Sequence, residues 1–149
     1  MVLTQDIVRT LQTYWHQQVS GQIPTLFPGV PTQIGQADAW FEFWVSTCQE
    51  PVHREISPTR LFALVDVHCF SRKSTNRQQL HSLVDSARSL SGIKLEVQHE
   101  DTAAALIRLD RLQVRDLSRT DQEHSEFTVL HAVVSLTAII EEFASTPAV

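Results

Sequence analysis

Lysine, cysteine and glycine are scarce in this chain of 149 residues, and long apolar runs are missing. Only two of its 12 basic residues are lysine, Lys73 and Lys94, and the formal net charge is -5. A general basic surface for nucleic-acid phosphates needs clustered lysine and arginine, so the composition argues against that class of binder. The remaining basic residues are arginine, the cation preferred at protein interfaces. This preference weakly favours a protein that works in an assembly.

The N-terminus and the two cysteines, Cys48 and Cys69, indicate which compartment to expect. Residues 1–6 have neither the basic segment nor the apolar stretch of an export signal. A reducing, cytoplasmic setting with free thiols is therefore the expectation. No stretch approaches the roughly 18 consecutive apolar residues of a spanning helix, so no membrane contact is expected.

Length and composition predict one domain over residues 1–149, because 42% of the residues are apolar and a core can form. A helix is expected over 4–19, with Thr4 as its N-cap. A second helix follows Asn76 as N-cap, carries apolar residues at helical spacing and ends at Gly92 in the left-handed conformation.

Alternating apolar residues with aromatic and β-branched enrichment predict the strands. The expected strands cover residues 39–46, 60–70, 93–98, 104–117 and 126–140. The strand 60–70 is apolar on both faces, so we expect it to be central and covered on two sides. The last two strands form a hairpin with a bulge between Leu109 and Leu112, where the alternation changes parity.

The hairpin arms are long for a domain of this size, at roughly 3.3 Å per residue. Either the strands bend, or the polar end of the hairpin projects from the body. The predicted class is α+β: a largely antiparallel sheet with two main helices packed on it and a long C-terminal β-hairpin.

Chemical motifs are missing from the sequence. None of the seven histidines belongs to an HExxH or paired Cys/His pattern, and neither cysteine has a catalytic signature. No GxSxG elbow or glycine-rich phosphate loop occurs. The paired carboxylates at 100–101 and 141–142 are adjacent, so they point to opposite sides of a strand. We therefore expect no enzyme activity, no cofactor and no metal site.

Two features are candidates for a contact between subunits. Trp40 and Trp44 share one strand face, where core packing competes with a role as interface anchors. Charges of both signs follow the hairpin, where cross-strand pairs on a solvated ribbon compete with an intersubunit contact zone. The candidate interface residues are Trp40, Trp44, Arg108, Arg111, Arg115, Asp116, Arg119, Asp121 and Glu123.

The order and size of the elements resemble the tail terminator, or tail-completion, proteins of long-tailed bacteriophages and related particles. In that family an N-terminal helix precedes an extended Phe-Pro segment, matched here by residues 26–31 (LFPGVP). A strand at 40–46, a strand and helix at 61–70 and 77–90, and a long strand at 127–140 complete the pattern. The resemblance is topological and covers nearly the whole chain.

The resemblance implies a structural virion protein. The family forms a hexameric ring on the last ring of the tail tube, stops its polymerisation and joins the tail to the neck. The implied partners are further copies of this chain, the tail tube protein, a neck or connector protein and, in a contractile tail, the sheath protein. DNA passes through the lumen without specific binding. The implied location is the tail–neck junction of a virion assembled in the host cytoplasm.

Two alternatives stay open on the sequence. One is another phage neck or head–tail adaptor protein. The other is a small enzyme or ligand-binding domain with a pocket between helix and sheet that contains His68, Asp66 or Cys69. A pocket protein would work as a monomer or dimer, whereas a ring closes through head-to-tail contacts.

Overall fold

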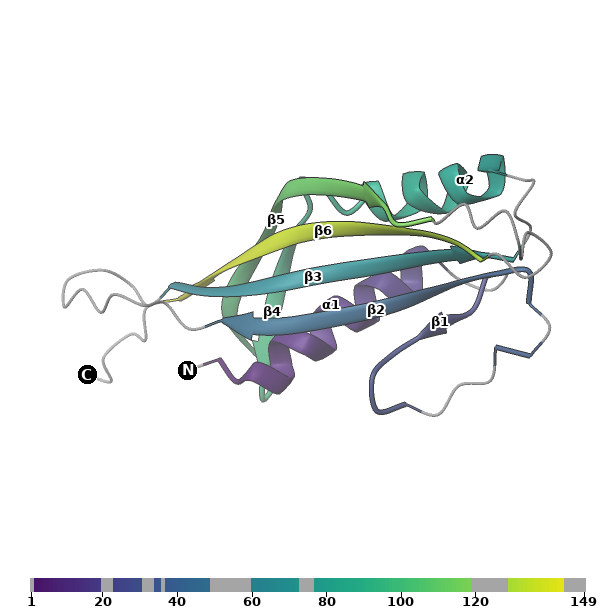
Figure 1. The fold of residues 1–149 in the computed structure, drawn as a ribbon. Coiled ribbons are helices and arrows are strands. Elements are labelled where there is room, and N and C mark those ends of the chain that lie inside the picture. The colour runs from purple at the N-terminus through teal and green to yellow at the C-terminus, as the bar shows by residue number, and fades with distance from the viewer. Residues whose placement is uncertain are drawn as a thin grey trace, which may run out of the picture.

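The computed structural model describes residues 2–19, 23–30, 34–35, 37–48, 60–72, 77–118 and 129–143. Within these ranges the chain forms two helices and one six-stranded sheet (Figure 1). The helices are α1 (Thr4–Gln18) and α2 (Arg77–Arg88). The strands are β1 (Thr25–Leu26), β2 (Ala39–Cys48), β3 (Arg60–Ser71), β4 (Lys94–His99), β5 (Thr102–Asp116) and β6 (Leu130–Glu142). The predicted α+β class is confirmed. Neither helix is long and apolar enough to cross a membrane.

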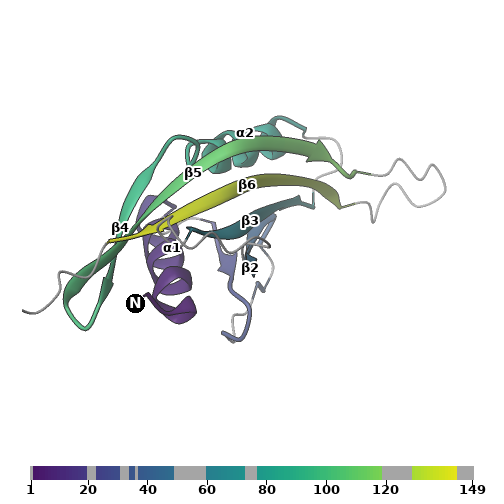
Figure 2. The same cartoon turned by 90° about the vertical axis from the view of Figure 1, so that its left-hand side faces the viewer.

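The strands lie in the order β1-β2-β3-β6-β5-β4, and all neighbours are antiparallel except β1 and β2. The chain crosses from β3 through α2 to the edge strand β4, which leaves room for β6 between β3 and β5. The pairing of β3 with β6 runs from Arg60 opposite Glu141 to Ser71 opposite Leu130. The described arms of the hairpin therefore lie inside the sheet and bend with it (Figure 2). Its tip, residues 119–128, falls outside the described residues.

The bulge predicted from the change of parity in β5 is confirmed. The register of β5 against β6 shifts between Asp110 and Gln113. Arg111 sits inside this shift with a φ of 55°, which an L residue seldom adopts. The extra residue restores the alternation of side chains on either side of it and allows the strand to bend.

One face of the sheet carries the hydrophobic core, and both helices pack on that face. Trp15 of α1 meets Phe41 and Phe43 of β2, with ring centroids 5.0 and 5.4 Å apart. On the α2 side, the hydroxyl of Ser71 on β3 donates a hydrogen bond of 3.0 Å to Gln79. The buried strand residues include Ala63, Val65, Val67, Cys69, Ala105, Ile107, Leu109, Val134, Leu136, Ala138 and Ile140.

The opposite face of the sheet has no covering helix in the described part of the chain. Leu64 on the central strand β3 is 45% exposed there, and Phe62 and Phe70 are half-buried. The prediction that this strand is covered on two sides is therefore wrong. Both helices share one face, so Leu64 and Trp44 on the other face stay nearly half exposed, although Val133 and Trp40 on that face are buried.

The first helix begins at Thr4, as the predicted range does, but its N-cap residue differs from the prediction. Leu3, not Thr4, occupies the N-cap position, and its amide N–H donates a hydrogen bond of 3.1 Å to the Asp6 carboxylate. The Asp6 carboxylate in the first turn thus binds the backbone of the N-cap residue, and the predicted cap from a threonine hydroxyl is not made. The second predicted N-cap, Asn76, lies outside the described residues. Gly92 has the predicted left-handed conformation, with a φ of 81°.

Candidate assembly interface

We call the side of β2, β3, β6 and β5 that faces away from the two helices the outer face. Several of the residues that the sequence suggested for an interface lie on it. The strand register aligns its side chains in rows across the sheet. Three rows run from β2 through β3 to β6: Trp40, Phe70 and His131; Glu42, His68 and Val133; Trp44, Asp66 and Ser135.

The first row is a ladder of stacked rings. The Trp40 and Phe70 centroids are 5.2 Å apart with planes 13° apart, and Phe70 and His131 are 4.3 Å apart at 14°. The Arg72 guanidinium lies 5.1 Å from the centre of the Trp40 ring, within reach of a cation–π contact. Aromatic pairs of this kind each contribute about 0.5–1.5 kcal/mol beyond the area they bury. Trp40, only 9% exposed, thus stabilises the outer face within the single chain.

Trp44 has a different environment from Trp40. It is 46% exposed, and its indole N–H donates a hydrogen bond of 3.3 Å to the Glu42 carboxylate on the same strand. In the adjacent row, Leu64 is also nearly half exposed. A large aromatic ring beside a leucine at the surface is the kind of anchor found at protein contacts. The candidate pair of tryptophans thus divides into one packed ring and one available ring.

His68 and His131 form a pair that sequence reasoning missed. Nδ1 of His68 and Nε2 of His131 are 2.8 Å apart, so one nitrogen donates a proton and the other accepts it. Burial lowers the pKa of His131 below its usual value, and the neighbouring His68 lowers it further, against the opposing effect of the Glu42 and Asp116 carboxylates. The two histidines are 63 positions apart. The pairing of β3 with β6 brings the two histidines together, and no local sequence pattern predicts that pairing.

The charged candidates of β5 separate according to the face they occupy. Arg115 pairs with Val133 and Arg108 with Ile139, which places both arginines on the outer face. Arg111 lies in the bulge.

Asp116 turns to the helix side, where its carboxylate meets the Arg77 guanidinium at 3.2 Å. The Ser118 amide bonds the same carboxylate at 2.8 Å and is the main cause that lowers the pKa of Asp116. Arg119, Asp121 and Glu123 lie outside the described residues.

The three residues named for a pocket between helix and sheet, Asp66, His68 and Cys69, do not come together in one. Asp66 and His68 point to the outer face, whereas Cys69 points into the core, because neighbouring strand residues alternate. Burial raises the pKa of the Cys69 thiol to about 12, which keeps it protonated and unreactive. Within the described ranges, no three His, Cys, Asp or Glu side chains gather to hold a metal ion.

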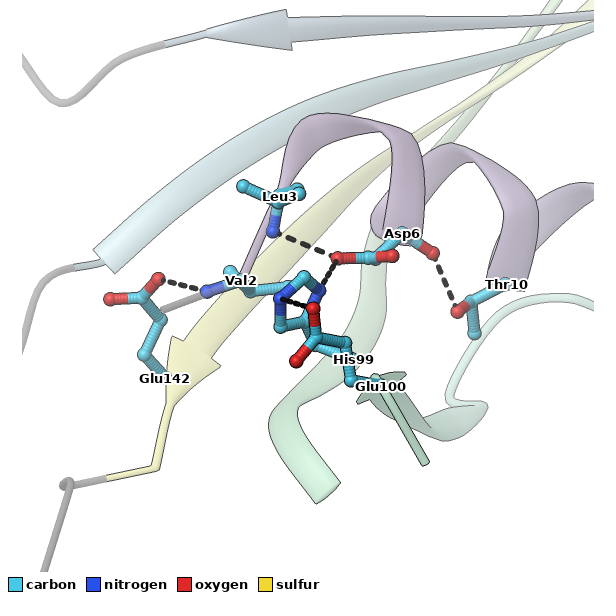
Figure 3. A network of polar contacts seen from close by, with 7 residues as sticks. All are labelled: Val2, Leu3, Asp6, Thr10, His99, Glu100 and Glu142. Atoms are coloured by element: carbon cyan, nitrogen blue, oxygen red, sulfur yellow. Dashed lines mark hydrogen bonds and ion pairs between the residues drawn. The ribbon is translucent and has the colours of Figure 1, made fainter. Parts of the chain in front are cut away.

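A polar groove of about 480 Å³ lies between α1 and β4, and a network of polar contacts borders it (Figure 3). Asp6, 4% exposed, accepts the Leu3 amide and lies 2.9 Å from Nδ1 of His99. Close by, the Val2 amide donates to Glu142 at 2.9 Å. This network joins the chain's beginning to the end of β4 and the end of β6. Every member has a partner, so we assign it to holding these segments together.

No protein-family model matches the chain, and no curated protein matches it. Solved structures do, among them two that align with nearly all of this chain. One, which carries a sequence identifier as its name, aligns with a TM-score of 0.64 and 10% identity over 97% of this chain and 100% of that chain. The other comes from the virion of a native gene transfer agent (GTA) particle and aligns with a TM-score of 0.50 and 10% identity over 91% of each chain. The chain shares its fold with a component of a virion particle. At 10% identity, the similarity is evidence of a shared fold.

Proposed function

We propose that this chain is a structural virion protein of the tail terminator type. Its copies close into a ring, hexameric as in the family it resembles, which caps the tail tube, stops tube polymerisation and joins the tail to the neck. The observation that carries the proposal is the likeness to a chain of the gene transfer agent virion, which spans nearly all of both chains. The family resemblance read from the sequence points to the same class of particle.

The outer face supports an assembly role. A monomeric domain normally keeps large apolar side chains from gathering on an open sheet face. Here Trp44 and Leu64 stand exposed beside half-buried Phe62 and Phe70. Exposed apolar side chains gathered in this way are typical of surfaces that contact other proteins.

The partners follow from the proposed place in the particle. They are further copies of this chain, the tail tube protein, a neck or connector protein and, in a contractile tail, the sheath protein. DNA passes through the ring without specific binding, which suits a chain with a net charge of -5 and two lysines. The proposed location is the tail–neck junction of a virion assembled in the host cytoplasm.

The direct test is a capping experiment. The tail tube protein of the same particle is polymerised with and without the purified protein, and tube lengths and ends are imaged by negative staining. We expect shorter tubes whose ends carry one ring of this protein. Tubes of unchanged length with bare ends contradict the proposal. A ring that binds a connector and leaves tubes bare would instead make it a neck or head–tail adaptor protein.

A further inference from the structure

The sheet has a free edge at each end in the described part of the chain. At one end, β1 pairs only with Phe41 and Glu42, so residues 43–48 of β2 have no described partner strand on that side. At the other end, β4 pairs with β5 and no described strand lies beyond it. We call these the β2 edge (residues 43–48) and the β4 edge (residues 94–99). A free edge is a template for pairing with another strand.

The β2 edge lacks the protection that is usual at such a position. Edge strands of folded domains commonly carry lysine, proline or a bulge, which discourage pairing with another chain. Residues 43–48 (FWVSTC) include no charged residue and no proline. Their pairing with β3 continues without a shift of register, and Trp44 among them is 46% exposed. The composition of this edge therefore favours a contact with a further strand.

The backbone groups that the β2 edge leaves free belong to its odd-numbered residues. The Phe41 amide donates a hydrogen bond of 2.9 Å to the Pro24 carbonyl, on the side away from β3. Backbone groups alternate in direction along a strand, so the N–H and C=O of Val45 point to the same side.

On the β4 edge the free groups belong to the even-numbered residues. The Leu109 amide of β5 donates a hydrogen bond of 3.0 Å to the Ile93 carbonyl, so the odd-numbered residues of β4 bond to β5. The N–H and C=O groups of Lys94 and Glu96 therefore point away from the sheet.

The two edges also agree in direction and in the faces of their side chains. The steps from β2 to β3, β6, β5 and β4 are all antiparallel, so β2 and β4 run in the same direction. Val97 of β4 is buried in the core, so Lys94 and Glu96 lie on the opposite face, the one that carries Glu42 and Trp44 on β2.

We infer that the β2 edge of one copy pairs in parallel with the β4 edge of the next, so that the sheet continues from copy to copy. The inference rests on the proposed ring and names the contact that builds it. In the register that sets Trp44 beside Glu96, the free backbone groups of Glu96 meet those of Phe43 and Val45, as a parallel ladder requires. The same register sets Glu42 beside Lys94.

The charges beside the β4 edge favour this register. Lys94 lies opposite Arg108, and Glu141 borders both. Two cations against one carboxylate leave this corner with positive charge, and like charges directly opposite each other are unfavourable. The Glu42 carboxylate of the neighbouring copy supplies a second negative charge there.

The β4 edge also has space beside it. The groove of about 480 Å³ between α1 and β4 is lined on the strand by Leu95, Glu96 and Gln98. Adding a strand to a sheet edge requires room for its alternate side chains. The contact joins two different edges in the same sense each time, and such heterologous contacts close into rings.

Disulfide cross-linking tests the pairing and its register. Trp44→Cys and Glu96→Cys are made separately and together in a Cys48→Ser background, which removes the native cysteine of β2. Neighbours on paired strands lie about 5 Å apart, within disulfide reach under mild oxidation. On a non-reducing gel, we expect neither single variant to cross-link with itself, whereas their mixture gives two-chain products. The double variant gives a ladder that ends at the ring size. Trp44→Cys mixed with Ser82→Cys, an exposed position on α2, stays uncross-linked.

A proline at the β2 edge provides an independent test. Val45→Pro removes an outward N–H and no hydrogen bond to β3, so the single chain should still fold. We expect the protein concentration needed for half-assembly, measured by light scattering, to rise at least about tenfold. Val45→Thr, which keeps the N–H, assembles like the wild type. Circular dichroism verifies folding, and if Val45→Pro does not fold, the cross-linking decides.

The outcomes separate the contact from the ring. Rings whose mixed cysteine variants fail to cross-link, or a Trp44→Cys variant that cross-links with itself, overturn the inference and leave the proposed function standing. Wild-type assembly by folded Val45→Pro does the same. Cross-linked chains that grow into open filaments keep the contact and overturn the ring. A wild-type chain that stays monomeric at the highest soluble concentration overturns both.

Discussion

Asp6 connects two parts of the chain through one buried carboxylate. It accepts the Leu3 amide at the start of α1 and lies 2.9 Å from His99 at the end of β4. Its own carbonyl accepts the Thr10 hydroxyl at 2.7 Å. Burial alone would raise the pKa of Asp6, but the bonds from Leu3 and His99 outweigh it and lower that pKa. The charged form is therefore the one that the fold stabilises.

Replacing Asp6 tests this role. Asp6→Ala removes the hydrogen bonds to Leu3 and His99, so we expect a lower urea midpoint at neutral pH. Asp6→Asn keeps an oxygen that can accept the Leu3 amide, so its midpoint should fall between those of the wild type and Asp6→Ala. Because the folded pKa lies below the usual 3.8, the Asp6 contribution is complete above that value and is lost as pH falls through the folded pKa. Asp85→Ala, at an exposed carboxylate of α2, is the control. Equal midpoints for Asp6→Ala and Asp85→Ala would refute the role.

The His68–His131 pair gives the outer face a dependence on pH. The folded pKa of His131 is lowered, so the unfolded chain takes up a proton at a higher pH than the folded chain does. The free energy of unfolding therefore decreases as pH falls through the unfolded value of 6.5 towards the folded pKa. Double protonation would also remove the acceptor in the hydrogen bond between the rings.

We expect His131→Gln to lose part of this pH dependence. Urea unfolding is measured at about pH 7.5 and about pH 5.5, a window that brackets the unfolded histidine pKa. The wild type loses more stability across the window than His131→Gln does. His81→Gln, at an exposed position on α2, keeps the wild-type difference. A His131→Gln variant with the full wild-type difference would contradict the assignment.

Among the elements, the β4–β5 hairpin turns through two residues in an unusual conformation. His99 pairs with Thr102, so Glu100 and Asp101 alone form the turn, with φ values of 49° and 62°. Two-residue hairpins of this kind favour Asn-Gly, because glycine and asparagine enter the left-handed region at little cost. Glutamate and aspartate thus hold a less favourable backbone here.

Substituting the favoured pair tests the strain in this turn. Glu100→Asn with Asp101→Gly is expected to raise the free energy of unfolding by about 1 kcal/mol, in the range of optimised turns. Ser89→Asn with Ser91→Gly, at exposed positions after α2, offers a control pair outside the hairpin. A turn variant less stable than the wild type would show that the two carboxylates stabilise the turn by other contacts.

The local sequence pattern was sufficient to predict most helices and strands and to assign side chains to the faces of the strands. The spacing of Leu80, Leu83 and Ala87 predicts α2, and the parity change in β5 predicts its bulge. The strand order could not be read, because the insertion of β6 between β3 and β5 depends on pairings between distant residues. For the same reason the sequence placed Trp40 and Trp44 on one face but could not tell which of them stacks on Phe70.

At the scale of the whole molecule, the described residues form two layers, with both helices on one side of the sheet. α1 and α2 fill one face of the sheet, and the strands arch over α1 in Figure 2. The other face carries stacked rings, exposed apolar groups and charges of both signs. In the proposed ring, contacts between copies would cover exposed apolar groups of this kind.

The mass of the purified protein in solution tests this account most directly. Size-exclusion chromatography with light scattering, followed by negative-stain imaging of the peak, measures the number of chains and their arrangement. The account predicts a closed ring with about six times the chain mass of 16.9 kDa, in line with the cyclic symmetry of heterologous contacts. A species of 16.9 kDa that persists at the highest soluble concentration, with no rings in the images, would contradict it.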